Sequence, residues 1–174
     1  MTAVHARSWR ATYAGLLPDA VIDDVVHARA ARTERWRTQL SQADQGRGSF
    51  VATMEGRVVG FVFWGSGQTS DEAEVHAIYV DPSVTGRGIG RALLGAAVDD
   101  IATNRSSAAV LWVLDRNERA RRFYEAAGWS ADGGTKAEHR EGGTLHEIRY
   151  RLAIFKGARM PEPIACHPPT LSDG

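Results

Sequence analysis

Glycine recurs at every second position of one short stretch of the chain, the segment Gly-Arg-Gly-Ile-Gly at 86–90. The apolar run 77–80 precedes it and stops at Asp81-Pro82, which predicts a strand followed by a turn. Apolar residues at helical spacing come next, so we expect a helix over 87–103. A helix N-terminus offers free backbone N–H groups and the positive end of the helix dipole, and glycines let a ligand approach closely. The stretch therefore predicts a site for a phosphate or pyrophosphate group.

The spacing of these glycines does not fit two common phosphate-binding patterns. The chain has G-x-G-x-G where dinucleotide-binding folds have G-x-G-x-x-G. It has Arg91-Ala92 where a P-loop has Lys followed by Ser or Thr. Taken alone, the stretch is equally consistent with a tight turn that only caps a helix, so its meaning depends on the rest of the chain.

The elements that position this turn follow from hydrophobic periodicity and turn residues. We expect helices at 2–14, 19–27, 28–42, 87–103 and 117–127. We expect strands at 49–54, 57–64, 73–80, 108–114, 129–131 and 145–154, with a Gly-rich loop through Gly143 before the last one. This order predicts an α/β fold with a mixed sheet flanked by helices, in which 73–114 is a parallel strand–helix–strand crossover.

The length of 174 residues predicts one domain, which we place at 1–156. The segment 157–174 holds four of the six prolines, so we expect an irregular tail there.

Composition narrows the classes of function. Lys and Arg (21) balance Asp and Glu (21), and a formal net charge of zero argues against a nucleic-acid partner. No apolar run reaches the ~20 residues of a membrane span, and the N-terminus has no apolar signal region. We therefore expect a cytoplasmic protein with no membrane partner. The lone Cys166 and the six scattered histidines show neither metal-ligand spacing nor a nucleophile arrangement, so no metal is expected.

Two segments, read together, form a recognisable pattern. The first is Ile78-Tyr-Val-Asp-Pro82 running into Gly86-Arg-Gly-Ile-Gly-Arg-Ala-Leu-Leu94. The second is Leu114-Asp-Arg-Asn117, then Ala120 and Phe123-Tyr-Glu-Ala-Ala-Gly-Trp129. They resemble the acyl-CoA pyrophosphate loop and the asparagine and helix end of the GNAT superfamily of acetyl-CoA-dependent N-acetyltransferases. Residues 8–18 are similar, more weakly, to the opening helices of one bacterial branch. The resemblance implies a GNAT-type fold with acetyl-CoA as cosubstrate.

The chain departs from the family pattern in two places. Thr85 stands where the family has Gln or Arg, a long donor that helps to hold the loop and the phosphates. The family also begins with a strand before its first helix, and this chain begins almost inside that helix. We therefore expect a sheet that lacks the usual first edge strand or fills that edge with another segment.

The resemblance implies roles along the cofactor. The backbone of 86–91 would hold the pyrophosphate, and the strand at 78–80 would pair with the pantetheine arm. Asn117 would bond that arm, cap its helix, or do both. Tyr124 would be the general acid that protonates the departing thiolate, its alternative being a core aromatic. The predicted cofactor-binding residues are Ile78, Tyr79, Val80, Gly86, Arg87, Gly88, Ile89, Gly90, Arg91, Asn117 and Tyr124.

Arginines at two places have two open interpretations each. Arg87 and Arg91 either meet phosphate directly or belong to a solvated helix start. A basic patch on the next helix is either a solvated face or a contact for the ribose phosphate of the cofactor; it comprises Arg116, Arg119, Arg121 and Arg122.

Three residues are candidates for the base that takes a proton from the amine: Glu74, His76 and Glu72. We favour Glu74, because a carboxylate there, acting directly or through a water, fits a habit of the family. Period-two alternation would place Glu74, His76 and Ile78 on one strand face, and Asp71 with Glu72 would make the approach acidic. The alternative is a solvated strand end.

Aromatic side chains are candidates for an acceptor pocket, with a place in the core as the alternative: Trp9, Tyr13 and Trp64. The leading hypothesis is transfer of an acetyl group from acetyl-CoA to a small-molecule or peptide amine by direct attack in a ternary complex. The alternative, motivated by Thr85 and the missing strand, is a non-catalytic acyl-CoA-binding or sensor module of the same fold. A homodimer is left open, because many proteins of this type are dimers.

Overall fold

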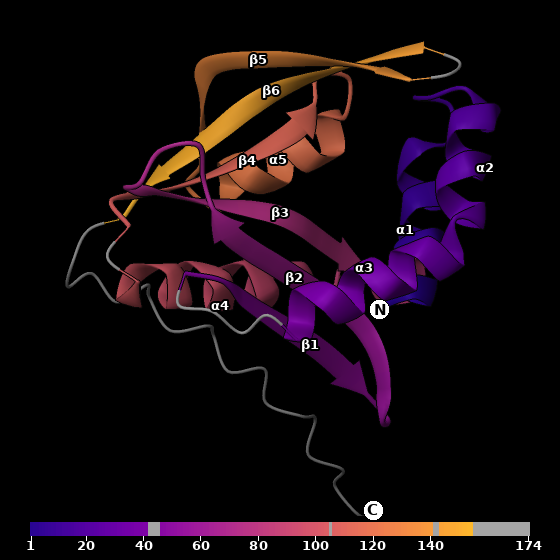
Figure 1. Cartoon of the computed structure of the whole chain (residues 1–174), viewed down its shortest axis with the longest axis horizontal. Coiled ribbons are helices and arrows are strands. Elements are labelled where there is room, and N and C mark those ends of the chain that lie inside the picture. The colour runs from indigo at the N-terminus through magenta and orange to yellow at the C-terminus, as the bar shows by residue number, and fades with distance from the viewer. Residues whose placement is uncertain (42–45, 105, 141–142, 155–174) are drawn as a thin grey trace, which may run out of the picture.

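The computed structural model describes residues 1–41, 46–104, 106–140 and 143–154. One mixed sheet organises them, with six strands in the order β1-β2-β3-β4-β6-β5 (Figure 1). The strands are β1 (Gly48–Met54), β2 (Arg57–Ser66), β3 (Glu72–Val80), β4 (Ala108–Leu114), β5 (Ser130–Arg140) and β6 (Gly143–Ala153). β3 and β4 are parallel, and every other neighbouring pair is antiparallel. The predicted mixed α/β sheet and its parallel pair are confirmed.

Helices cover the sheet in two groups. The first group is α1 (Thr2–Tyr13), α2 (Asp19–His27) and α3 (Arg29–Ser41), which Figure 1 shows gathered at one side. The second is α4 (Ile89–Thr103), which lies along β1 to β3, and α5 (Glu118–Ala126). A single 3-10 turn, η1 (Pro82–Val84), joins β3 to the glycine turn.

Successive side chains of β2 point to opposite faces of the sheet. Val62 and Trp64 belong to the main core cluster, together with the apolar side chains of α4. Phe61 and Phe63 point to the other face, where both rings contact Trp36 of α3 at centroid distances of 5.2 and 6.1 Å. β2 is therefore buried on both faces, as its nearly continuous apolar sequence requires.

β3 and β4 lie side by side only at their beginnings. Their paired register covers Glu72 to Glu74 of β3 against Ala108 to Val110 of β4 and goes no further. From there to their carboxyl ends the two strands diverge, and among the described residues no strand pairs with that side of the later part of β3. This divergence creates the gap in which the cavity described below lies.

A β-bulge in β3 corrects one sequence expectation. Phe63 pairs with Ala77 and Trp64 pairs with Val75, so His76 is an extra residue in the ladder. The bulge interrupts the period-two alternation, and Ile78 packs against the core on the α4 side. The expectation that Ile78 shares a face with Glu74 and His76 is therefore wrong.

The Gly-rich segment after Trp129 is also different from expectation. It is not a loop, because β5 continues to Arg140 and pairs with β6 along most of its length. The glycines instead form an irregularity between Ala131 and Thr135, where Gly133 has φ +87° and Asp132 accepts a hydrogen bond from the Gly134 N–H. Glycine inside a strand marks a bulge as readily as a loop.

β1 is the edge strand on one side, and within the described ranges no strand pairs with its outer edge. The predicted tail 157–174 lies outside the described residues, and the domain boundary stays a prediction. No helix of the described part combines the length and apolar character needed to cross a membrane.

Candidate functional site

A cavity of about 900 Å³ lies where β3 and β4 diverge. Its lining comes from α1, the later part of β3, the glycine turn, the first turn of α4, the end of β4, and α5. Segments far apart in the sequence therefore meet around one space. In open α/β sheets, ligands bind at such places, outside the carboxyl ends of neighbouring strands.

The glycine turn forms one end of the cavity. Gly86 and Gly88 have φ values of +81° and +78°, a conformation that side chains with a Cβ rarely adopt. Gly88 is the N-cap of α4 and makes no side-chain cap hydrogen bond. The N–H groups of the first turn of α4 have no partner within the helix, so they are available to an anion.

Thr85 contributes to the turn in its own way. Its hydroxyl donates a hydrogen bond of 3.1 Å to the carbonyl oxygen of Pro82 and so closes the 3-10 turn η1. Thr85 also lines the cavity. The side chain that replaces the family's long donor therefore stabilises the loop from within.

Asp81 anchors the same loop to α1. Its carboxylate accepts hydrogen bonds from the N–H and hydroxyl of Ser83 at 3.1 and 2.8 Å and an ion pair from Arg7 at 2.5 Å. Burial works to raise the pKa of Asp81, but the Ser83 and Arg7 contacts outweigh it and lower that pKa. The next residue of α1 is Ser8, whose hydroxyl donates a hydrogen bond of 2.6 Å to the carbonyl oxygen of Val80.

Ten of the eleven predicted cofactor-binding residues line the cavity: Ile78, Tyr79, Val80, Gly86, Gly88, Ile89, Gly90, Arg91, Asn117 and Tyr124. Arg87 is the exception, since its side chain is not part of the lining. Asn117 caps α5, because its side-chain oxygen accepts the Ala120 N–H at 3.1 Å.

Tyr124 forms the inner wall of the cavity from α5. Its ring lies 5.2 Å from Phe123, 6.3 Å from Trp129 and 6.1 Å from Tyr150 between centroids. Burial, with a smaller effect of Tyr13, raises the pKa of Tyr124. The phenol therefore stays neutral at physiological pH and presents an O–H donor.

A second and a third phenol meet Tyr124 in the same cavity. Tyr13 comes from the end of α1, and Tyr79 comes from β3 on the sheet face opposite α4. Burial raises the pKa of Tyr79 well above its ordinary value, and Tyr13 and Tyr124 add to that rise. Side chains from three elements thus converge in the gap between the strands.

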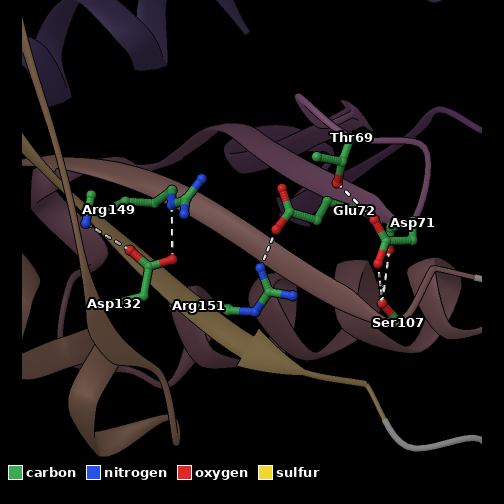
Figure 2. A network of polar contacts seen from close by, with 8 residues as sticks. Thr69, Asp71, Glu72, Ser107, Asp132, Arg149 and Arg151 are labelled. Carbon is green, nitrogen blue, oxygen red and sulfur yellow. Dashed lines mark hydrogen bonds and ion pairs between the residues drawn. The ribbon is translucent and has the colours of Figure 1, made fainter.

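The three candidates for the base are placed differently. His76 lines the cavity, whereas Glu74 lies behind it and holds the His76 Nδ1 at 3.0 Å from its Oε1. Glu72 is buried and forms an ion pair with Arg151, which Figure 2 shows beside the hydrogen bonds of Asp71 to Thr69 and Ser107. Arg151 therefore balances the charge of Glu72, whereas Asp71 stays ionised, because the hydrogen bonds from Thr69 and Ser107 lower its pKa.

The predicted acceptor-pocket aromatics separate into three cases. Tyr13 lines the cavity. Trp9 is not part of the lining and supports Tyr13, with ring centroids 4.2 Å apart. Trp64 is a core residue with 1 % exposure, and its indole N–H donates 3.1 Å to Asp100 of α4. The structure therefore does not bring Trp64 to the site.

The four arginines of the predicted basic patch fall into two groups, one inside the cavity lining and one outside it. Arg116 and Arg119 line the cavity. Arg121 bonds the Tyr150 hydroxyl and the Asp115 carbonyl, and Arg122 pairs with Glu118 at 3.1 Å. Arg116 precedes α5 and its N-cap Asn117, whereas the spacing of 119, 120 and 123 marks one face of the helix and could have indicated from the sequence which arginine of α5 lines the cavity.

Several lining residues were not among the predictions, and they include Ser8, Trp112 and Phe123. Trp112 is the extreme case, because nothing in the apolar run of β4 distinguishes it as a site residue. The described residues hold no group of three or more His, Cys, Asp or Glu side chains placed to bind a metal.

Comparisons with known proteins agree with this geometry. The chain is 26% identical to a protein of Mycobacterium tuberculosis named a probable N-acetyltransferase, over 87% of this chain and 86% of that one. It is 32% identical to an uncharacterized N-acetyltransferase of Methanocaldococcus jannaschii, over 61% of this chain, and spans only 49% of that relative's length.

Solved structures share the fold. The PaiA N-acetyltransferase of Thermoplasma acidophilum, crystallised with coenzyme A, superimposes with a TM-score of 0.68 at 21% identity, covering 87% of this chain and 89% of that one. A GNAT-family acetyltransferase structure from Desulfovibrio desulfuricans superimposes with a TM-score of 0.64 at 25% identity, over 88% and 92% of the two chains. Residues 6–129 match the model of the acetyltransferase (GNAT) family, and the chain belongs to that family.

Proposed function

We propose that this chain transfers an acetyl group from acetyl-CoA to a primary amine by direct attack in a ternary complex. One observation carries the proposal: a single cavity joins the free N–H groups of a glycine turn to the hydroxyl of Tyr124 through the gap between β3 and β4. Membership of the GNAT family and the coenzyme A of the Thermoplasma structure support acetyl-CoA as the cosubstrate.

The cofactor end fits this cosubstrate. The backbone of 86–91 is suited to the pyrophosphate, with Arg91 close enough to add its charge. Beyond the bulge, β3 pairs with β2 on one side, and no strand of the described part of the chain pairs with its other side. Main-chain groups of 78–80 on that open side are suited to pair with the amides of a pantetheine arm, as an added strand would.

The chemistry needs a deprotonated amine and a protonated sulfur. The amine nitrogen attacks the thioester carbonyl carbon, the C–N bond forms, and the C–S bond breaks. The sulfur gains a proton while the nitrogen loses one, so these two changes balance. Tyr124 is the proposed acid, and burial supports this role because it keeps the hydroxyl neutral and available as a donor.

The amine acceptor, a small molecule or a peptide, is proposed to enter beside α1 and β3. Tyr13 and Trp112 line that part of the cavity, and Trp9 holds Tyr13 in place. The base belongs to this end, where Glu74 and His76 form a hydrogen-bonded pair.

The test is acetyl-CoA consumption with a panel of primary amines, comparing the unchanged protein with Tyr124→Phe. We expect kcat to fall about 10²- to 10³-fold while coenzyme A affinity, measured by calorimetry, changes little. Tyr150→Phe is the matched control, because its ring packs against Tyr124 but its hydroxyl bonds Glu125 outside the cavity.

The outcome that contradicts the proposal is tight coenzyme A binding without acetylation of any amine. That result would favour the alternative, an acyl-CoA-binding or sensor module. Equal activity of Tyr124→Phe and Tyr150→Phe would leave the enzyme assignment standing and remove Tyr124 as the acid.

A further inference from the structure

The base of the proposed reaction is the imidazole of His76, as we infer from the arrangement of the Glu74–His76 pair. Glu74 acts as its positioning residue and does not itself take the proton. This inference rests on the proposed function and assigns within it the residue that the sequence left open among three. It reverses the preference for Glu74 that the sequence suggested.

Access is the first reason. His76 belongs to the lining of the cavity, and about 38 % of its side chain is exposed. Glu74 is not part of the lining, and only about 18 % of its side chain is exposed. An amine in the cavity therefore meets the imidazole before it can reach the carboxylate.

The bulge explains why the imidazole has this position. His76 is the extra residue between the paired positions Val75 and Ala77, so its backbone is displaced from the regular ladder. Its ring stacks on Phe63 of β2 at 5.7 Å between centroids and 28° between planes. A ring held by stacking on one side and by a hydrogen bond at one nitrogen has little freedom to turn.

The hydrogen bond to Glu74 sets the tautomer. Contacts with His76, then smaller effects of Lys136 and Trp112, outweigh partial burial and lower the pKa of Glu74, so its carboxylate is ionised. An ionised carboxylate only accepts hydrogen bonds, so Nδ1 must carry the proton. The neutral imidazole then has its lone pair on Nε2, the nitrogen that a base needs.

Glycine at position 65 leaves room beside that nitrogen. A Cβ at Gly65 would stand 3.1 Å from His76 Nε2, closer than nearly all ordinary contacts of a Cβ. Any larger residue there would crowd the nitrogen that we assign as the base.

The charges around His76 are mixed. Glu74 faces it from the same strand, Arg47 lies beside Gly65, and Lys136 of β5 faces Glu74. The phenols of Tyr13 and Tyr79 share the cavity. Glu74 contacts the ring through its hydrogen bond and stabilises the imidazolium that forms when Nε2 takes a proton.

The proton balance is complete without another reactant. An ammonium acceptor gives one proton to Nε2, and the free amine attacks the thioester. The second nitrogen proton is lost as the sulfur gains its proton, through Tyr124. His76 returns its proton to solvent after each turnover.

The first test compares His76→Gln with Glu74→Gln by the pH dependence of kcat/KM. We expect His76→Gln to lower kcat/KM about 10²-fold or more and to remove the acid limb of the pH profile. Its deficit should shrink as the pH rises toward the pKa of the amine, because the amine then needs no base. Glu74→Gln should lower kcat/KM about tenfold. It should also move the acid limb of the profile to lower pH, because the imidazolium of His76 loses its counter-ion. His139→Gln is the matched control, a histidine of β5 outside the cavity lining.

Wild-type turnover and the Tyr124→Phe effect decide the proposed function before this comparison is made. If the enzyme is active and His76→Gln keeps its acid limb while Glu74→Gln loses it, the carboxylate is the base and our assignment is overturned. If no amine is acetylated by the unchanged protein, both proposals fail together.

A second measurement does not depend on the acceptor. Nitrogen-15 NMR of the histidine side chains in the free protein should show His76 protonated at Nδ1, and Glu74→Leu should remove that preference. A His76 protonated at Nε2 in the unchanged protein overturns the inference.

Discussion

The two ends of the cavity differ in the groups that form them, which are main-chain groups at one end and side chains at the other. The end proposed for the phosphates, here called the phosphate end, is main chain: two glycines in the left-handed region and the free N–H groups of α4. The end proposed for the acceptor, here called the amine end, is formed by side chains from α1, β3, β4 and α5 that meet across long sequence separations. The first kind of site depends on local conformation and the second depends on packing. Substitutions should therefore act locally at the glycine turn and spread through the fold at the amine end.

The largest effect is expected at the buried ion pair two residues before Glu74. Glu72 is 6 % exposed in its side chain, and within the described residues its second oxygen has no partner, so Arg151 alone neutralises it. Arg151→Met should lower the free energy of unfolding by about 3 kcal/mol, because a buried charge is left unpaired. Urea unfolding measures this loss.

The double variant Arg151→Met with Glu72→Gln is the control for this prediction. It removes both charges and should recover a large part of the stability. If the double variant is as unstable as the single one, the side-chain packing of Arg151 matters and the charge does not.

The second effect is a pH dependence at α1. Burial, helped by the charge of Arg32, lowers the pKa of His5 from 6.5 to about 4. Between these values the unfolded chain binds the proton and the folded chain does not. The contribution of His5 to stability should therefore be fully present above about pH 6.5. The free energy of unfolding should fall by on the order of 2 kcal/mol as the pH drops toward 4.

Denaturant unfolding between pH 7 and 4 checks this window, with His5→Gln expected to flatten it. The carboxylates with lowered pKa, such as Glu74 and Asp81, lose their contribution only at more acidic pH, below their usual range. A flat profile for the unchanged protein would contradict the assignment to His5.

The third effect tests the glycine turn. Gly88→Ala places a Cβ at φ +78°, which should cost about 1–2 kcal/mol of stability. We expect coenzyme A to bind about tenfold more weakly because the turn must distort. Amine KM should change less than the coenzyme A affinity, since the damage stays at one end.

Gly95→Ala is the matched control. An added Cβ has open space at both glycines, but Gly95 lies in the ordinary helical region of α4. Alanine should therefore stabilise the helix there by roughly 0.5–1 kcal/mol. Equal responses of the two variants would show that backbone conformation is not what Gly88 supplies.

The smallest effect belongs to Thr85. Thr85→Ala removes one hydrogen bond to Pro82 and should cost about 0.5–1.5 kcal/mol of stability. Coenzyme A affinity, measured by calorimetry, should change less than about threefold. A tenfold loss would mean that the hydroxyl contacts the phosphates directly.

The contrast between the two ends explains what the sequence could predict. The strand, turn and helix around Gly88 and the cap at Asn117 depend on neighbouring residues, so local rules sufficed. The helices, the strands and the parallel pairing of β3 with β4 followed from hydrophobic periodicity and turn residues in the same way, whereas the order of the strands in the sheet did not. For this reason ten of the eleven residues predicted to bind the cofactor line one cavity, and their role in binding stays a prediction.

The amine end was less predictable because its geometry is set by partners distant in sequence. Nothing in Val75-His76-Ala77 signals a bulge, which arises from pairing with β2. The sequence around Trp64 does not distinguish it from other aromatic residues on strands. Its place in the core depends on a hydrogen bond to Asp100 of α4, which lies 36 positions away. Glycines at 133 and 134 were read as a loop because a bulge inside a strand uses the same residue.

The attachment of α1 has a consequence for how the two ligands bind. Arg7 and Ser8 fasten this helix to Asp81 and Val80, the residues that lead into the glycine turn, and the same helix carries Tyr13. We therefore expect a ligand that orders the turn to order also the wall that is proposed to contact the amine. Thermodynamic linkage then requires that the amine raises the affinity for the cofactor by the same factor by which the cofactor raises the affinity for the amine. The dissociation constant of coenzyme A, measured with and without a saturating amine, gives that coupling directly.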